Sequence, residues 1–290
     1  METINYISVD RLYQQFPELR KQDVEELNLW VREQPHLPPV SELQLIQFLF
    51  SNYYDMAAAK RTTEAYFTFR TNCKDFFYNR DLTLEPLHRA MDILALCVIP
   101  KCTSDGYQVL FAKIIDPDVS KFSLAAVLKL AFICADIILW EEGCTEGHVL
   151  IIDMHGLHLG HLPKLGIFTL KNFLYYIQEA LPIRLKGVHL INVVPFIDTI
   201  MMMIKPFLKK ELLDIFHIHQ KEETLYPFVA KQLLPKDYGG QASSRTDLKT
   251  QLYDKILGCR EHLLQIDLSL MVDETKRLKT RSFTNMFGLF

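Results

Sequence analysis

Glycine is scarce in this sequence, with 11 among 290 residues, and the glycine-rich phosphate-binding motifs are absent. Neither GxGxxG nor GxxxxGKS/T occurs, so the sequence lacks the turns that bring backbone amides against a nucleotide phosphate. The GxSxG, HExxH and protein-kinase motifs are missing as well. These absences argue against the corresponding enzymes, and we expect a non-enzymatic protein that uses no cofactor.

An excess of one charge sign is also lacking. The chain has 32 Lys and Arg against 35 Asp and Glu, a net charge of −3, which gives no general reason to bind nucleic acid. The most apolar helix-length stretch, 124–140, contains Lys129 and Asp136 and is therefore a poor bilayer span. Residues 1–5 lack the basic and apolar regions of a signal peptide. We expect a cytoplasmic protein whose 49% apolar residues build a sizeable core.

The six cysteines contain no CxxC pair, and several lie within apolar runs. This pattern favours reduced cysteines that pack in the interior. A disulfide framework or a zinc site is the alternative.

Three zones follow from the hydrophobic patterning, and the first, 1–80, is predicted to be helical. Apolar residues recur at helical spacing over 24–31, before Pro35. After Pro38 and Pro39, Ser41 is positioned to cap a second helix, and Asp55 a third that runs toward Phe69. We therefore expect an N-terminal helical domain.

The second zone, 81–240, alternates apolar strands with helices. The pattern predicts strands at 107–115, 149–152, 188–193 and 215–219, and helices at 123–140, 164–180, from 195 onward and at 225–234. Such alternation predicts an α/β fold with a mixed, largely parallel β-sheet covered by helices. The third zone, 241–290, is predicted to hold one helix over 247–271 and a basic, aromatic tail.

Five histidines invite a metal-site interpretation. His155, His158 and His161 follow a predicted strand at HxxHxxH spacing, but two glycines break the helix that would align them. We interpret them as ordinary loop residues, with a zinc site as the alternative. His217 and His219 share one face of a predicted strand, which favours half-buried, hydrogen-bonded side chains over metal ligands.

The predicted elements carry more apolar surface than a simple core requires. Two sets of side chains share a face by helical or strand periodicity, namely Leu128, Ala131, Phe132 and Ala135 on one helix, and His148, Leu150 and Ile152 on the next strand. The helix after Pro195 carries a stripe of Ile197, Ile200, Met201 and Ile204, and three successive methionines that cannot all face one core. These residues are either core or the lining of an adaptable binding surface.

Several runs of residues together resemble the CRAL-TRIO lipid-binding family, and within it the branch of tocopherol-transfer and retinaldehyde-binding proteins. The runs are IIDMHG at 151–156, QEALPIRLKGVHLIN at 178–192, IKPFL at 204–208, HIH at 217–219 and LPKDYGG at 234–240. The resemblance extends over about 24–240. It implies an N-terminal helical bundle and an α/β domain, with a hydrophobic pocket between the sheet and a mobile lid helix.

The resemblance also implies the ligand-binding residues. They are Leu128, Ala131, Phe132, Ala135, His148, Leu150, Ile152, Phe173, Ile177, Leu181, Leu185 and Val188 in the pocket, and Ile197, Ile200, Met201, Ile204 and Leu208 on the lid. His148 is the polar member: it either hydrogen-bonds the head group of a ligand or is satisfied by a nearby backbone group.

The function implied is transfer of a small hydrophobic ligand of the tocopherol, retinoid or carotenoid type between membranes, through transient contact with a membrane surface. One alternative is a phospholipid- or phosphoinositide-sensing or exchange protein of the same fold. The other is a lipid-modifying enzyme, which would need an acid–base pair or a nucleophile in the cavity.

The basic residues depart from the pattern of the family. Arg184, Lys186, Lys209 and Lys210 are the candidates for a phosphoinositide or membrane site, but the usually arginine-rich N-terminal motif reads QFLFSN at 47–52. Three arginines of the usual patch are replaced, so the sequence implies at most a reduced site. The tail offers a second membrane contact through Lys276, Arg277, Lys279, Arg281, Phe283, Phe287 and Phe290, or else it folds back over the domain.

Overall fold

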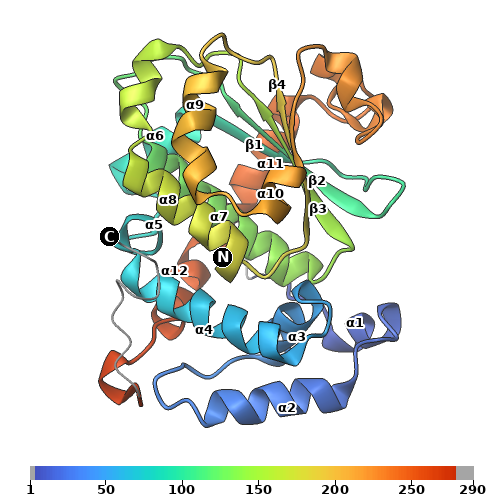
Figure 1. The fold of residues 1–290 in the computed structure, drawn as a ribbon, viewed down its shortest axis with the longest axis vertical. Helices are drawn as coiled ribbons and strands as arrows, with labels where there is room; N and C mark the ends of the chain where they lie inside the picture. Colours follow the sequence, from blue (N-terminus) through green and yellow to red (C-terminus); the bar gives the residue numbers. More distant parts are fainter. Residues whose placement is uncertain (1–3, 279–290) are drawn as a thin grey trace.

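The computed structural model describes residues 4–278 and has two layers (Figure 1). Helices from the first 80 residues lie below a sheet that is flanked by the remaining helices. The helices are α1 (Val9–Gln15), α2 (Lys21–Arg32), α3 (Glu42–Ser51), α4 (Met56–Asn72), α5 (Lys74–Phe77), α6 (Glu85–Ile93), α7 (Leu124–Glu142), α8 (Ile167–Tyr175), α9 (Ile197–Ile204), α10 (Lys210–Asp214), α11 (Arg245–Gly258) and α12 (Arg260–Ser269).

The N-terminal helices begin where the sequence places capping side chains. Ser41 Oγ accepts a hydrogen bond from the Gln44 amide, and the Gln44 side-chain oxygen accepts one from the Ser41 amide, which completes a capping box at α3. Asp55 caps α4 in the same manner by accepting from the Ala58 amide at 2.8 Å. The apolar faces of these helices join α7 in one continuous hydrophobic cluster.

The sheet has five strands in the order β1-β2-β3-β4-β5. Strand β1 pairs antiparallel with β2, and every following pair is parallel, so the expected mixed, largely parallel sheet is confirmed. The strands are β1 (Leu94–Val98), β2 (Tyr107–Ile114), β3 (Gly147–Asp153), β4 (Leu185–Ile191) and β5 (Phe216–Ile218).

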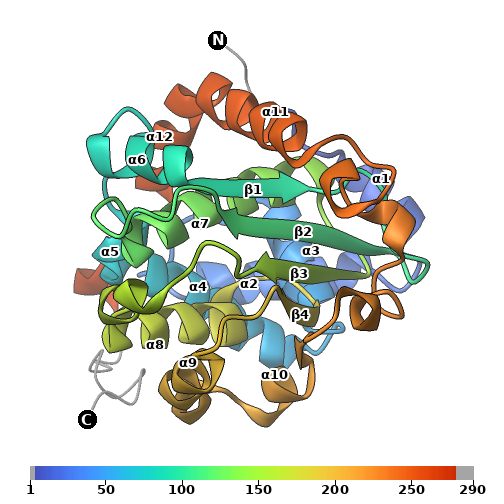
Figure 2. The same cartoon turned by 90° about the horizontal axis from the view of Figure 1, so that it is seen from above.

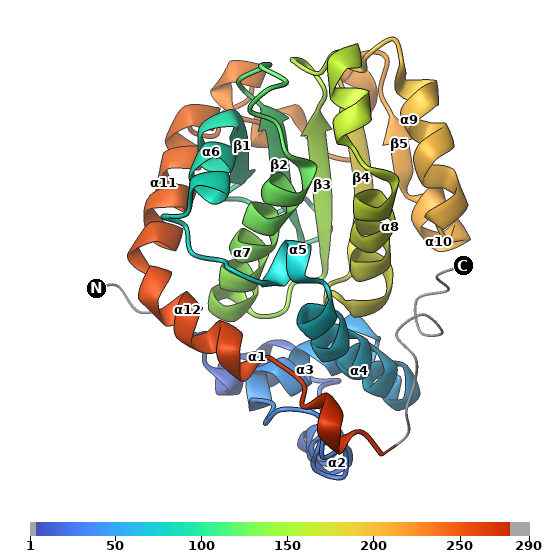
Figure 3. The ribbon, with the colours of Figure 1, turned by 90° about the vertical axis from the view of Figure 1, so that its left-hand side faces the viewer.

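Helices cover the sheet unevenly. Figure 3 shows α7 and α8 in front of one face, and Figure 2 shows α11 along the β1 edge and α9 and α10 at the opposite edge. On the other face, Val149 and Ile151 of β3 pack with Leu225, Val229 and Leu234 in a separate cluster. Because successive strand residues point to opposite faces, their neighbours Leu150 and Ile152 face α7 and α8.

Three predicted helices differ in the structure. The prediction of a helix over 225–234 is wrong. Short 3-10 turns form at Glu222–Leu225 and Lys231–Leu233 instead, because Pro227 lies between them and disfavours a continuous helix. The helix expected over 164–180 is interrupted at Gly166, whose φ of 60° is not helical, and it ends in a π-turn at Tyr176–Ala180. The helix expected over 247–271 is two helices separated at Cys259.

The last described segment lies against the N-terminal helices. The Val272 amide donates to Thr71 Oγ1 and the Asp273 amide to the His36 carbonyl, each at 2.9 Å. Lys279, Arg281, Phe283, Phe287 and Phe290, which carry most of the predicted tail contact, lie outside the described residues.

Candidate functional site

A cavity of about 330 Å³ lies between the sheet and the helices that cover it. Its floor comes from alternate residues of neighbouring strands: Leu110 of β2 pairs with Leu150 of β3, which pairs with Val188 of β4. Ile152 and Leu190 form the next pair along the sheet. The volume is at the lower end of the range for small-molecule sites, about 300–1,000 Å³.

Helical residues supply the walls. Ala131 and Ala135 of α7 are one turn apart, and their small side chains leave space that Phe132 borders. Phe173 of α8, whose ring lies 6.2 Å from that of Phe132, and Ile177 of the following π-turn continue this wall. Among the described residues that line the cavity, His148 is the only one whose side chain carries nitrogen or oxygen.

The α9 helix closes one side of the cavity. Ile200 and Ile204, separated by about one turn, line the cavity together with Leu208 and Leu212. The methionines diverge as their spacing predicts, because successive residues are rotated by about 100°. Met201 is buried, whereas Met202 is 69% exposed on the outer face.

Fourteen of the seventeen predicted ligand-binding residues line this cavity. The other three, Leu128, Ile197 and Met201, do not line it and are buried in the adjoining hydrophobic clusters. On α9, Ile197 and Met201 lie on the flank of the face that Ile200 and Ile204 present. Their position explains why one stripe serves both core packing and the cavity.

Sixteen further residues that line the cavity were not predicted from the sequence. They include Leu96 and Val98 of β1, a strand that was not predicted, and Leu252 of α11, which follows the family-like segment. Strand alternation alone identifies Leu110, because it is in register with Leu150. No signal in the sequence points to Leu252, since its place depends on how α11 packs along β1.

His148 has an unusual environment for a histidine. Its side chain is 5% exposed, its Nε2 lies 3.4 Å from Thr145 Oγ1, and its Nδ1 has no hydrogen-bond partner among the described residues. Burial lowers the pKa of the imidazole to about 4, so the ring is neutral at pH 7. No backbone group satisfies this Nδ1 within the described part of the chain.

Two of the predicted phosphoinositide residues, Arg184 and Lys186, contact aromatic rings. The Arg184 side chain is 8% exposed, its Nε donates to the Phe50 carbonyl, and its guanidinium lies over the rings of Phe50 and Tyr53. Lys186 donates to the Tyr53 hydroxyl at 2.8 Å. Arg184 thus has internal partners for its charge and its hydrogen bonds.

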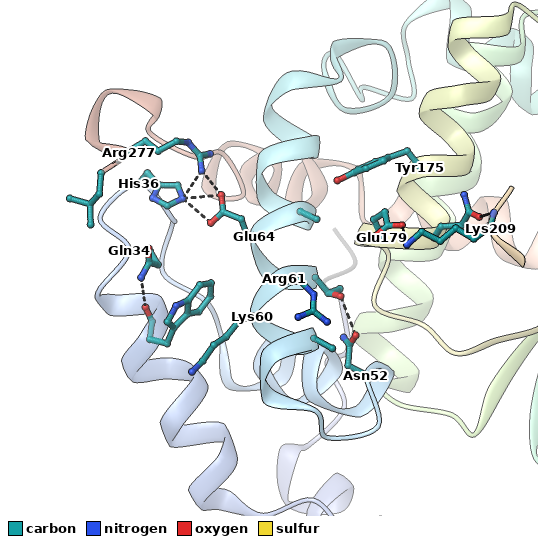
Figure 4. Close-up of a pocket in the computed structure, with 16 residues that line it drawn as sticks. Gln34, His36, Asn52, Lys60, Arg61, Glu64, Tyr175, Glu179, Lys209 and Arg277 are labelled. Atoms are coloured by element: carbon teal, nitrogen blue, oxygen red, sulfur yellow. Dashed lines mark hydrogen bonds and ion pairs between the residues drawn. The ribbon is translucent and has the colours of Figure 1, made fainter. Parts of the chain in front are cut away.

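Lys209 and Lys210 lie elsewhere, at the start of α10, and both are exposed. Lys209 forms an ion pair with Glu179 at the rim of a second, polar hollow of about 710 Å³ (Figure 4). Across this hollow, Arg277 forms an ion pair with Glu64, which also hydrogen-bonds His36. The hollow is lined by four cationic and two anionic side chains, and both carboxylates, Glu64 and Glu179, are already paired with cations of the lining.

The remaining predicted histidines pack in two groups: the rings of His158 and His161 lie 4.4 Å apart, and those of His217 and His219 both lie against His189. His158 Nε2 contacts the Pro117 carbonyl, and His161 Nδ1 lies 3.2 Å from the His158 amide nitrogen. His219 lies just beyond β5, is buried, and hydrogen-bonds His189 and Thr224. His217 is half-buried and stacks on the His189 ring, so the prediction of two half-buried, hydrogen-bonded histidines holds in part. Across residues 4–278, no three His, Cys, Asp or Glu side chains converge as a metal site. None of the six cysteines, all of which lie within the described residues, forms a disulfide.

None of the described helices combines the length and the apolar character that crossing a bilayer requires.

Two family models match the chain, and together they cover both layers of the fold. The CRAL/TRIO domain matches residues 94–240, which contain the whole sheet and α7 to α10. The Pinta-like UBA domain matches residues 16–87, which contain α2 to α5 and part of α6.

Similar proteins share most of the chain. A human protein named alpha-tocopherol transfer protein-like is 29% identical over 254 residues, which are 84% of this chain and 71% of the relative. Clavesin-1 of Rattus norvegicus is 24% identical over 228 residues, covering 77% of this chain and 64% of the relative. The crystal structure of Sfh5 aligns with a TM-score of 0.48 and 12% identity over 72% of this chain and 75% of that one.

Proposed function

Since the chain belongs to the CRAL-TRIO family of lipid-binding proteins, we propose that its cavity carries one small hydrophobic molecule, of the tocopherol, retinoid or carotenoid type, between membranes. The observation that supports this proposal is the cavity of about 330 Å³, whose described lining is apolar except for His148. The likeness to alpha-tocopherol transfer protein-like sequences favours this ligand type over a phospholipid.

The hydrophobic effect explains why a hydrophobic molecule needs a carrier to move between membranes. Withdrawing about 400 Å² of apolar ligand surface from water is worth roughly 10 kcal/mol at 25 cal/mol per Å². A molecule with that preference rarely leaves a bilayer on its own. A cavity that opens at the membrane surface shortens its exposure to water and so accelerates transfer.

The α9 helix is the element that we propose to open. It is eight residues long and contributes Ile200 and Ile204 to the cavity, so its displacement would uncover the ligand. The same motion would expose these side chains, and a bilayer would shield them from water. Met202, exposed on the outer face of α9, already offers an apolar contact.

Transfer between vesicles tests this proposal. Donor vesicles carry a fluorescent tocopherol or retinol, and acceptor vesicles carry a quencher. Wild-type protein should accelerate transfer, and Ile200→Asp should abolish the acceleration because it places a carboxylate in the apolar cavity. The matched control, Asp198→Asn, alters a polar, exposed position of the same helix and should transfer normally. An Ile200→Asp protein with undiminished transfer would contradict the role of α9.

A lipid-modifying enzyme receives less support from the same lining. Among the described lining residues, His148 is the only candidate acid or base, and neither of the lining thiols, Cys97 and Cys134, is activated. Burial raises the pKa of both thiols to about 12, so they are protonated and unreactive at pH 7.

A further inference from the structure

The two ring nitrogens of His148 have different surroundings, and this difference bears on the ligand. Nε2 lies 3.4 Å from Thr145 Oγ1, whereas Nδ1 is buried and has no partner among the described residues. The side chain lines the cavity on the same face of β3 as Leu150 and Ile152. An unpartnered polar atom in a side chain that borders an apolar cavity constrains what can bind beside it.

Thr145 determines which nitrogen carries the proton. Its hydroxyl donates to the Gly147 carbonyl at 3.2 Å, and a carbonyl oxygen accepts only, so the single hydroxyl hydrogen is used there. The hydroxyl oxygen then faces Nε2 as an acceptor, which requires the hydrogen on Nε2. Because the ring is neutral at pH 7, Nδ1 keeps its lone pair and can only accept.

We propose that the cavity selects a hydrophobic alcohol or phenol, whose hydroxyl donates a hydrogen bond to Nδ1 of His148. An aldehyde, ester or ether of the same skeleton has no hydrogen to donate, so its oxygen would face the lone pair of Nδ1. This inference rests on the proposed carrier function and adds to it the chemistry of the ligand head.

The position of His148 also orients the ligand. It lies near the beginning of β3, in register with Gln108 and Leu185, and Ile152 lies four residues further along. At about 3.3 Å per residue, that is roughly 13 Å along the cavity floor. The hydroxyl would therefore bind at the amino end of β3, with the hydrocarbon extending past Ile152 toward Ile204 of α9.

Matched ligand pairs test the proposal. We would measure displacement of a fluorescent polyene hydrocarbon, diphenylhexatriene, by retinol against retinaldehyde and by α-tocopherol against its methyl ether. The alcohol or phenol of at least one pair should displace the hydrocarbon about tenfold more strongly than its partner, since one buried hydrogen bond is at stake. Equal displacement within both pairs would overturn the proposal and leave the carrier function intact.

Two variants distinguish the selection of the ligand head group by His148 from the binding of hydrocarbon by the cavity. His148→Leu should lose the preference within the pair, read as the ratio of the two displacement constants so that any change in hydrocarbon affinity cancels. Thr145→Val, which preserves shape and removes the acceptor for Nε2, should weaken the preference because Nδ1 can then carry the hydrogen. A preference that survives in His148→Leu would contradict the proposal. Failure of the wild-type protein to bind the hydrocarbon or either pair would refute the carrier function together with it.

Discussion

The guanidinium carbon of Arg184 lies 3.7 Å from the centre of the Phe50 ring, while Nε of the same side chain donates to the Phe50 carbonyl at 2.9 Å. Phe50 belongs to the α3 segment that the family resemblance expects to be rich in arginine. With an aromatic ring at this position, Arg184, which directly precedes β4, packs against α3 and becomes part of the contact between the two layers.

This contact predicts that Arg184 contributes to stability, whereas Lys209 and Lys210 contribute to membrane binding. Arg184→Ala should lower the melting temperature and change binding to anionic vesicles little. Lys209→Ala combined with Lys210→Ala should weaken vesicle binding, by about 1 kcal/mol or fivefold for each lysine that approaches the surface. Cosedimentation with phosphatidylcholine vesicles, with and without phosphoinositide, measures both effects. Loss of vesicle binding in Arg184→Ala at unchanged stability would contradict this assignment, and equal binding to both vesicle types would rule out phosphoinositide recognition.

Filling the cavity should remove ligand binding without unfolding the protein. Ala135 of α7 lines the cavity, so the indole of Ala135→Trp would occupy the space of the ligand. We expect at least a tenfold loss of affinity for a fluorescent hydrocarbon, measured by titration. Ala57→Trp, at an exposed position of α4, is the matched control and should bind normally. Unchanged affinity in Ala135→Trp would place the ligand elsewhere.

A buried ion-pair network should dominate the response of stability to mutation. Asp136 of α7 receives hydrogen bonds from Arg70 at 2.9 and 3.0 Å and from Arg80 at 2.7 Å, and all three side chains are buried. Asp136→Ala should lower the free energy of unfolding by about 3–5 kcal/mol, because it leaves two guanidinium groups without this partner. Urea denaturation measures the loss.

The control for this prediction is an exposed pair. Arg20 and Asp23 form an ion pair in which the arginine is 70% exposed, so Arg20→Ala should leave the unfolding midpoint nearly unchanged. A similar midpoint shift in Asp136→Ala and Arg20→Ala would show that burial does not determine how much these ion pairs contribute to the free energy of unfolding.

His148 should also make stability depend on pH. Burial lowers the pKa of its imidazole to about 4 in the folded protein, against about 6.5 when unfolded, so the unfolded chain binds the extra proton between these values. The stability due to the neutral ring is therefore present above pH 6.5 and is lost as the pH falls toward 4. From pH 7 to pH 5 the loss is about 2 kcal/mol.

A comparison of variants isolates this contribution from that of the other histidines. His189 is shifted in the same direction, to a pKa of about 3, but it contributes equally to wild type and to His148→Leu. The urea midpoints measured at pH 7 and at pH 5 should therefore differ less in His148→Leu than they do in the wild-type protein. An identical pH dependence of the two proteins would mean that His148 is not buried as a neutral ring.

Sequence patterning predicted the features that depend on neighbouring residues. The caps at Ser41 and Asp55, the α7 face of Ala131 and Ala135 and the β3 face of Leu150 all follow from local chemistry and periodicity. The family resemblance added the lining residues that periodicity alone does not choose, such as Phe173 on α8.

Other features required the three-dimensional arrangement. Strand β1 was not predicted because its five apolar residues follow α6 without an intervening turn, so no boundary in the sequence marks where the strand begins. The stacking of Arg184 on Phe50 joins residues 134 positions apart, and no local pattern encodes it. The free Nδ1 of His148 likewise depends on what surrounds it in space.

The most direct test of the central claim is native mass spectrometry of the purified full-length chain, before and after extraction with organic solvent. A carrier with an apolar cavity should retain one hydrophobic molecule per chain, seen as a discrete mass increment that disappears on extraction and is absent from Ala135→Trp. A protein that carries no increment, and acquires none when incubated with vesicles containing tocopherol, retinol or a carotenoid, would contradict the account.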